Sequence, residues 1–144
     1  MEKLRFGDSF CFEVIVDEDI DREDTLIPTL MIQPLAENAI WHGLMYKNGE
    51  KNLTIRFFRS AGMIYCSIED NGIGINKSEQ LKKMSNPSHK SVGLSNLRNR
   101  IKIMNEKYDT GCTLEITDLQ NIDSSRSGTR VVLRFKVITN KLYI

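Results

Sequence analysis

The alternation of apolar and polar residues along the chain predicts five strands, and apolar residues at helical spacing predict two long helices. In one strand Leu53, Ile55 and Phe57 share a face, and the dipeptide Ala61-Gly62 that follows is typical of a tight hairpin turn. The predicted strands cover residues 9–16, 52–60, 63–69 and 113–119 and a segment beginning at 128, and the helices cover residues 28–45 and 91–106.

The order of these elements is strand, helix, two strands, polar loop, helix and two strands. Short turns between most neighbouring strands favour antiparallel pairing, and two amphipathic helices can then cover one face of the sheet. We therefore predict one α+β domain over residues 1–144, a two-layer α/β sandwich with a mixed, mostly antiparallel sheet. The lysine-rich segment 76–90 predicts a long mobile loop with one helical turn near residues 79–84.

Two of the predicted elements have regular apolar faces of the kind that packs on a core. In the first strand the apolar face is formed by alternate residues, and in the second helix by residues three and four positions apart. These residues are Phe10, Phe12, Val14 and Val16 in the strand and Leu94, Leu97, Ile101 and Met104 in the helix.

Polar side chains interrupt the apolar face of the first helix. Asn38 and His42 are four residues apart, so on a helix they project from one face, within a stripe that includes Leu35 and Met45. Pro34 lies one turn earlier, where it should bend the helix and leave a carbonyl oxygen free. Because buried polar groups need partners, either the fold or a ligand must supply them.

The composition is that of an ordinary globular domain, with 40% hydrophobic and 27% charged residues. The net charge of +1 provides no overall attraction for nucleic acid or for an anionic membrane, although it is compatible with a local anion site. No apolar run is long enough to cross a membrane, and no signal peptide begins the chain. The 3 cysteines have neither metal nor disulfide spacing, so we expect buried thiols.

Four short segments combine residue types that suit a phosphate-bearing ligand. An acidic residue can accept a hydrogen bond from an amino group, glycines let the backbone approach a ligand, and a helix N-terminus favours phosphate. Each segment alone is more often a plain turn or a helix cap, so the prediction depends on their combination. The segments are Asn38 with His42, Asp70-Asn71-Gly72-Ile73-Gly74, Ser91-Val92-Gly93-Leu94 and Gly128-Thr129.

In this order the segments resemble the ATP-binding domain that sensor histidine kinases share with gyrase, the Hsp90 chaperones and MutL. This is the GHKL or Bergerat fold, and the resemblance is to its LytS/YehU-like kinase branch in particular. The match extends over nearly the whole chain. It comprises the N box at residues 33–40 with His42-Gly43, a first glycine box at 70–74, a second at 93–96 with Arg98 and Arg100, and the final Gly128-Thr129.

By this resemblance, adenine would be recognised where the second strand of the predicted hairpin ends. Asp70 would accept a hydrogen bond from the adenine amino group and so select adenine over guanine. His42 would line the adenine pocket, and Thr129 would hydrogen-bond at its floor, near Asp70. Gly72 and Gly74 would let the backbone pass close to the base.

The resemblance also implies two cofactors, ATP and Mg²⁺. Asn38 would ligate Mg²⁺ together with phosphate oxygens and water, and the backbone at Gly93 and Leu94 would receive phosphate. Relatives that hydrolyse ATP carry a glutamate four residues before the asparagine, where this chain has Pro34. We therefore expect Glu37 to form a structural hydrogen bond, or alternatively to act as the base for an acceptor imidazole.

Two further positions depart from the family pattern. The second glycine box usually begins with a glycine where this chain has Ser91, which would add strain of about 1 kcal/mol if that position needs a positive φ. Members of this branch commonly carry a lysine where this chain has Trp41. Lys47 or Lys90 would then supply the phosphate-facing cation.

The resemblance implies the catalytic, ATP-binding domain of a two-component sensor histidine kinase, which positions the γ-phosphate of ATP for attack by a histidine. The chain's 2 histidines, His42 and His89, suit other roles. The acceptor is therefore expected on an upstream dimerisation segment that this chain lacks, and a response regulator is the next partner. Such a domain would be cytoplasmic, in a protein anchored in the cell membrane, and would itself contact neither nucleic acid nor membrane.

Two alternatives remain open from the sequence. Ser91 and Trp41 favour a degenerate nucleotide-binding module that serves as an interaction or scaffold domain without kinase activity. A water-activating ATPase of the same family is the second alternative, and Pro34 argues against it.

Overall fold

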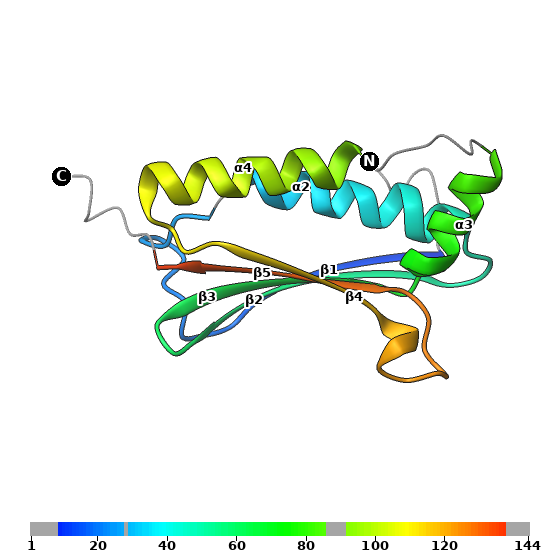
Figure 1. Ribbon diagram of the computed structural model, residues 1–144. Coiled ribbons are helices and arrows are strands. Elements are labelled where there is room, and N and C mark those ends of the chain that lie inside the picture. Colours follow the sequence, from blue (N-terminus) through cyan, green and yellow to red (C-terminus); the bar gives the residue numbers. More distant parts are fainter. Residues whose placement is uncertain (1–8, 28, 86–91, 138–144) are drawn as a thin grey trace.

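A mixed sheet covered by helices makes up the computed structural model, which describes residues 9–27, 29–85 and 92–137. Within these residues the strand order is β1-β2-β3-β5-β4 (Figure 1). The strands are β1 (Phe10–Val16), β2 (Lys51–Ser60), β3 (Met63–Asp70), β4 (Thr113–Asp118) and β5 (Thr129–Lys136). The helices are α2 (Thr29–Asn38), α3 (Ile75–Ser85) and α4 (Val92–Tyr108), with a π-helix at Ala39–Gly43 and 3₁₀ turns at Leu44–Tyr46 and Leu119–Asn121.

The predicted two-layer α+β architecture is confirmed. β1 pairs with β2 in parallel, whereas the β2–β3, β3–β5 and β4–β5 pairs are antiparallel. Both α2 and α4 lie on the same face of the sheet (Figure 1). The sheet is therefore mixed and mostly antiparallel, and its helices cover one side.

The turn between β2 and β3 explains the register of the central hairpin. Ala61 and Gly62 have φ values of +50° and +76°, and they connect Ser60 directly to its ladder partner Met63. Positive φ at both central positions matches the strand twist in a two-residue hairpin. The predicted turn is thus confirmed, and it fixes which face of β2 points toward the helices.

The core lies between the sheet and the helices, and it is built from the faces that the periodicity predicts. In α4, Leu97 and Ile101 are buried and Met104 packs against the core. In α2, Met31 and Leu35 are buried. The most completely buried side chains are Leu35, Leu44, Leu53, Ile64, Cys66, Ile68, Leu119, Leu133 and Phe135.

The edge strand β1 is less buried than its alternation suggests. Phe12 and Val14 pair with Leu53 and Ile55, so they face the helical side, yet they are 52% and 51% exposed. β1 lies at the end of the sheet, and the alternation of a strand reports its face but not how far the helices extend over it.

One of the three thiols departs from the prediction. Cys66 and Cys112 are buried, but Cys11 on β1 is exposed. Burial raises the pKa of Cys66 to about 12 and that of Cys112 to about 11, so both are unreactive thiols at neutral pH. Cys11 is exposed because it lies in the edge strand, where four of the other six strand residues are also exposed.

The prediction of a long loop at residues 76–90 is wrong for its first ten residues, which belong to the helix α3. The Asn76 N–H, in the first turn, donates to Asp118 Oδ2 over 3.1 Å. Ser78 is buried, and Glu79 and Lys82 form an ion pair one turn apart. Tertiary contacts at its first turn therefore stabilise a helix that the polar sequence does not predict. Residues 86–91, which include His89, Lys90 and Ser91, lie outside the described part of the chain.

Candidate functional site

Two of the four predicted segments meet at the end of β3, together with Gly43, which directly follows His42 of a third. Gly72 lies so close to the backbone of Gly43 that a Cβ there would overlap the Gly43 carbonyl group. The Ile73 N–H donates to the same Gly43 carbonyl oxygen over 3.3 Å. Gly128, with φ of +120°, lies against the carbonyl oxygen of Asp70 in the same way. Close backbone contact therefore requires glycine at both positions.

The side chain of Asp70 is at the centre of this junction and is 3% exposed. The Gly72 N–H donates to Asp70 Oδ1 over 2.8 Å, and the backbone N–H of Thr129 is a second donor. Burial raises the pKa of this carboxyl to about 6, while the two N–H donors oppose that rise. A Cβ on Gly43 would lie 2.8 Å from Oδ1, so the π-helix also closes over the carboxylate.

The turn after Asp70 is fixed by backbone partners. Asn71 Oδ1 accepts from the Asn52 N–H over 2.7 Å, and Asn71 Nδ2 donates to the Glu50 carbonyl oxygen over 3.1 Å. Lys47 Nζ donates to the Asn71 carbonyl oxygen over 2.6 Å. Lys47 is one of the two lysines expected to face phosphate, but in this structure its ammonium group bonds to the turn.

The polar residues of the first helix lie at a change of helix type. Asn38 ends α2 and is half-buried, and its side-chain amide makes no hydrogen bond to any residue in the described ranges. His42 is exposed and belongs to the π-helix that follows. Because a π-helix has more residues per turn than an α-helix, the two side chains are not aligned as a regular helix would align them. Glu37 is exposed and accepts a hydrogen bond from Gln33 Nε2 over 3.1 Å.

The fourth segment is only partly described. Gly93 and Leu94 lie in the first turn of α4, which begins at Val92. This turn lies toward the end of the sheet where α3 is found (Figure 1). Among the described residues, the backbone donors to the Asp70 carboxylate are Gly72 and Thr129, and neither belongs to this fourth segment.

Asp118 is a functional candidate that the sequence did not reveal. It ends β4 and is 6% exposed; its Oδ2 accepts from Asn76 N–H, and its Oδ1 from Gln120 N–H over 3.0 Å. Gly74 has a φ of +84°, and a Cβ there would lie 2.7 Å from Asp118 Oδ2. One buried carboxylate thus holds both the Gly74 turn and the start of α3.

Comparisons with known proteins agree with this geometry. The family model described as histidine kinase-, DNA gyrase B-, and HSP90-like ATPase matches residues 23–139. The chain is 33% identical over 106 residues to "Sensor histidine kinase YpdA" of Escherichia coli (strain K12), covering 72% of this chain and 18% of that protein. It is 38% identical over 103 residues to "Putative uncharacterized protein YwpD" of Bacillus subtilis (strain 168), covering 71% of this chain and 36% of that one.

The chain therefore spans only a minor part of the length of these relatives. Among solved structures, the catalytic domain of histidine kinase ThkA matches with a TM-score of 0.57 at 17% identity, covering 94% of this chain and 84% of that chain. The histidine kinase domain of the Erythrobacter litoralis EL346 blue-light activated kinase matches with a TM-score of 0.61 at 17% identity, covering 94% and 55%. At this identity the likeness establishes the fold.

The raised pKa of Asp70 predicts how stability changes with pH. Between about pH 4 and pH 6 the folded state binds more protons than the unfolded state, so the contribution of Asp70 to the free energy of unfolding falls as the pH rises. The total fall is about 3 kcal/mol. Urea denaturation of the wild type and of Asp70→Asn from pH 4 to pH 7.5 measures this fall. It should be seen as a pH-dependent change in the difference between the free energies of unfolding of the two proteins. A difference in unfolding free energy that does not change with pH would contradict the raised pKa of Asp70.

Removing the Asp118 carboxylate should loosen α3. Asp118→Ala leaves the N–H groups of Asn76 and Gln120 without their acceptor, at a cost of about 1–3 kcal/mol in the free energy of unfolding. Amide exchange should accelerate at the first turn of α3. Asp123→Ala is the control, because its exposed carboxylate bonds only within its own loop. If amide exchange in α3 is unchanged in Asp118→Ala, the Asp118 carboxylate does not stabilise this helix.

Proposed function

This chain belongs to the histidine kinase-, DNA gyrase B-, and HSP90-like ATPase family as an ATP-binding catalytic domain, and we propose that it positions Mg-ATP for phosphoryl transfer to a histidine on a separate segment. The transfer breaks the bond between the β–γ bridging oxygen and the γ-phosphorus and forms a bond from an imidazole nitrogen to that phosphorus. Such a step needs positioning and neutralisation of charge more than covalent participation by the domain.

The buried Asp70 carboxylate is the observation that carries this proposal. Its raised pKa means that the two backbone donors do not fully offset the cost of burying its charge. The amino group of adenine could donate a further hydrogen bond to this carboxylate. Gly72 and Thr129 lie beside Asp70, Gly74 shapes the turn that follows, and His42 from the π-helix would line the pocket.

The residues present fit a magnesium ion that is held jointly with the nucleotide. Within the described ranges no three His, Cys, Asp or Glu side chains are grouped to bind a metal, so the chain has no resident metal cage there. Asn38 has an uncommitted, half-buried carboxamide, and a carboxamide oxygen is a suitable ligand for magnesium. When bound, the ion would neutralise phosphate charge, and the backbone of Gly93 and Leu94 at the start of α4 would receive phosphate.

Glu37 precedes Asn38 and points elsewhere on the helix. Its carboxylate is exposed and is oriented by Gln33. We assign it first to this structural hydrogen bond. It would act on an acceptor imidazole only if the acceptor approaches α2 from the solvent side.

The wider setting follows from the relatives and is part of the proposal. The acceptor histidine would lie on a dimerisation segment of the same full-length kinase, and a response regulator would receive the phosphoryl group. We propose a cytoplasmic domain within a membrane-anchored protein. In the described part of the chain, no helix combines the length and apolarity needed to span a bilayer. No finding favours the degenerate module over the kinase domain.

Base recognition and metal recognition should separate in two variants. Asp70→Asn would place a donor where an acceptor is needed, and a hydrogen bond to a charged group contributes about 1.5–3 kcal/mol. Affinity for adenosine, ADP and ATP should therefore fall about ten- to hundred-fold, with or without Mg²⁺. Asn38→Ala should leave adenosine binding nearly intact and weaken the Mg²⁺-dependent part of ATP binding.

Calorimetric titration of adenosine and Mg-ATP into both variants measures these effects. Asn99→Ala is the matched control for Asn38→Ala, because Asn99 is exposed on α4. If Asp70→Asn binds adenosine with wild-type affinity, Asp70 does not contact the base. An equal loss of adenosine and Mg-ATP in Asn38→Ala would remove Asn38 from the metal site.

The isolated chain should bind ATP but hydrolyse very little of it. Pro34 stands where hydrolysing relatives carry a glutamate, and the nearby Glu37 is already bonded to Gln33. The prediction is a rate of phosphate release close to that of ATP in buffer, measured over many equivalents of nucleotide. Ready multiple-turnover hydrolysis would favour the water-activating alternative instead.

A further inference from the structure

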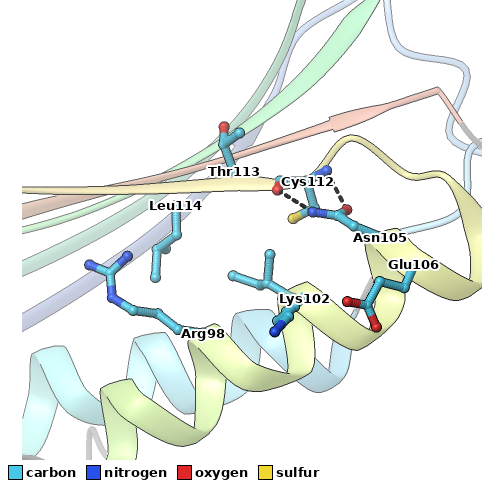
Figure 2. Close-up of a pocket in the computed structure, with 8 residues that line it drawn as sticks. Arg98, Lys102, Asn105, Glu106, Cys112, Thr113 and Leu114 are labelled. Carbon is cyan, nitrogen blue, oxygen red and sulfur yellow. Dashed lines mark hydrogen bonds between the residues drawn. The ribbon is translucent and has the colours of Figure 1, made fainter.

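A second concave site lies between α4 and β4, away from Asp70. It is a groove of about 380 Å³, and none of the candidate nucleotide residues lines it (Figure 2). Ile101, Cys112 and Leu114 provide apolar walls, and Arg98 and Lys102 project from α4 beside them (Figure 2). The volume is within the range of ligand-binding pockets and is large enough for one or two apolar side chains.

The closed end of the groove is held rigidly. Asn105 Nδ2 on α4 donates to the Cys112 carbonyl oxygen over 2.9 Å, and Asn105 Oδ1 accepts from the Cys112 N–H over 2.7 Å (Figure 2). Thr110 Oγ1 donates to the same Oδ1 over 2.6 Å. These bonds tie the start of β4 to α4, so the groove is preformed.

The groove borders an unpaired sheet edge. Among the residues that the structure describes, β4 is the last strand in the sheet order and pairs only with β5. The Leu119 N–H donates to the Gly128 carbonyl oxygen, on the β5 side, over 2.9 Å. In an antiparallel pair, the residues at every second position from Leu119 direct their backbone groups to that same side. Leu114 and Ile116 therefore direct their N–H and C=O groups away from β5, toward solvent. Leu114 also lines the groove, so edge and groove form one surface.

Three charged side chains of α4 line this surface, Arg98, Lys102 and Glu106, so the α4 side has a net charge of +1. Arg98 and Lys102 are exposed, and neither makes a hydrogen bond or an ion pair with any other residue that the structure describes. The Arg98 side chain extends toward β4 beside Leu114 (Figure 2). Because two cations without an ion pair among the described residues outnumber the single carboxylate of Glu106, this apolar hollow favours a partner that presents carboxylates together with an apolar side chain.

We infer that β4 and this groove bind an extended acidic segment of another protein, which pairs with the edge of β4 as an additional strand. Its backbone would bond to Leu114 and Ile116, an apolar side chain would enter the groove, and carboxylates two residues to either side would meet Arg98 and Lys102. In a strand, residues two positions apart share one face, so this spacing puts all three side chains toward α4. Addition of a strand to an open edge, with side chains read by an adjacent groove, is a recurring mode of peptide recognition.

The test uses a fluorescein-labelled heptapeptide with leucine at its centre, glutamate two residues to either side and threonine elsewhere. Fluorescence polarisation should give a Kd below about 100 µM. A peptide with lysine in place of glutamate, and one N-methylated at alternate residues so that it cannot pair with β4, should each bind at least tenfold more weakly. Arg98→Glu/Lys102→Glu should reverse the preference and bind the lysine peptide more tightly than the glutamate peptide.

The control Arg59→Glu/Lys83→Glu makes the same change in net charge at exposed residues elsewhere and should keep the wild-type preference. Thermal denaturation checks that both double variants fold. No binding of the glutamate peptide, or binding unaffected by N-methylation, would overturn the inference. A dimer in sedimentation analysis that Arg98→Glu/Lys102→Glu dissociates would assign the edge to a second copy of the chain and would equally overturn it. Nucleotide affinity tests the proposed function separately.

Discussion

The burial of the Asp70 carboxylate among backbone atoms is the constraint on which the arrangement of the site depends. Gly43, Gly72 and Gly128 come from three separate segments, and at each a side chain would overlap Asp70 or a neighbouring backbone. The carboxylate therefore has a position set by the main chain and not by a flexible rotamer. The backbone N–H groups of Gly72 and Thr129, and to a smaller extent the charge of Lys47, offset part of the cost of its burial, and its pKa stays raised to about 6. We propose that this carboxylate is preorganised for a donor that a ligand supplies.

The parts of the fold that the sequence predicts are those in which local pattern and burial coincide. β2 and β3 follow from the alternation of Leu53, Ile55 and Phe57 and from the turn at Ala61-Gly62, and the stripe of α4 follows from its helical spacing. α3 was missed because its stabilisation comes from Asp118, 42 residues away in sequence. Periodicity carries no information about a partner at that distance.

In the site too, some features follow from the local sequence and others do not. The motif identifies Asp70 and its glycines because their roles depend on residue type. It did not identify the roles of Lys47 and Asn71, since both bind main-chain atoms, which any sequence possesses. The sequence does not predict the π-helix either, because the spacing from Asn38 to His42 also fits a continuous α-helix. Residue chemistry was therefore easier to predict than the backbone geometry that directs it.

Strand β4 connects the two sites without providing a mechanism for coupling them. Asp118 at its end holds the Gly74 turn, and Leu114 near its start lines the groove. Coupling between sites requires an element with two arrangements whose equilibrium both ligands change. β4 keeps one continuous register with β5, and Asn105 ties Cys112, the residue just before β4, to α4. A segment that pairs with the outer edge would add hydrogen bonds to this single arrangement, so the geometry favours two sites that are occupied independently.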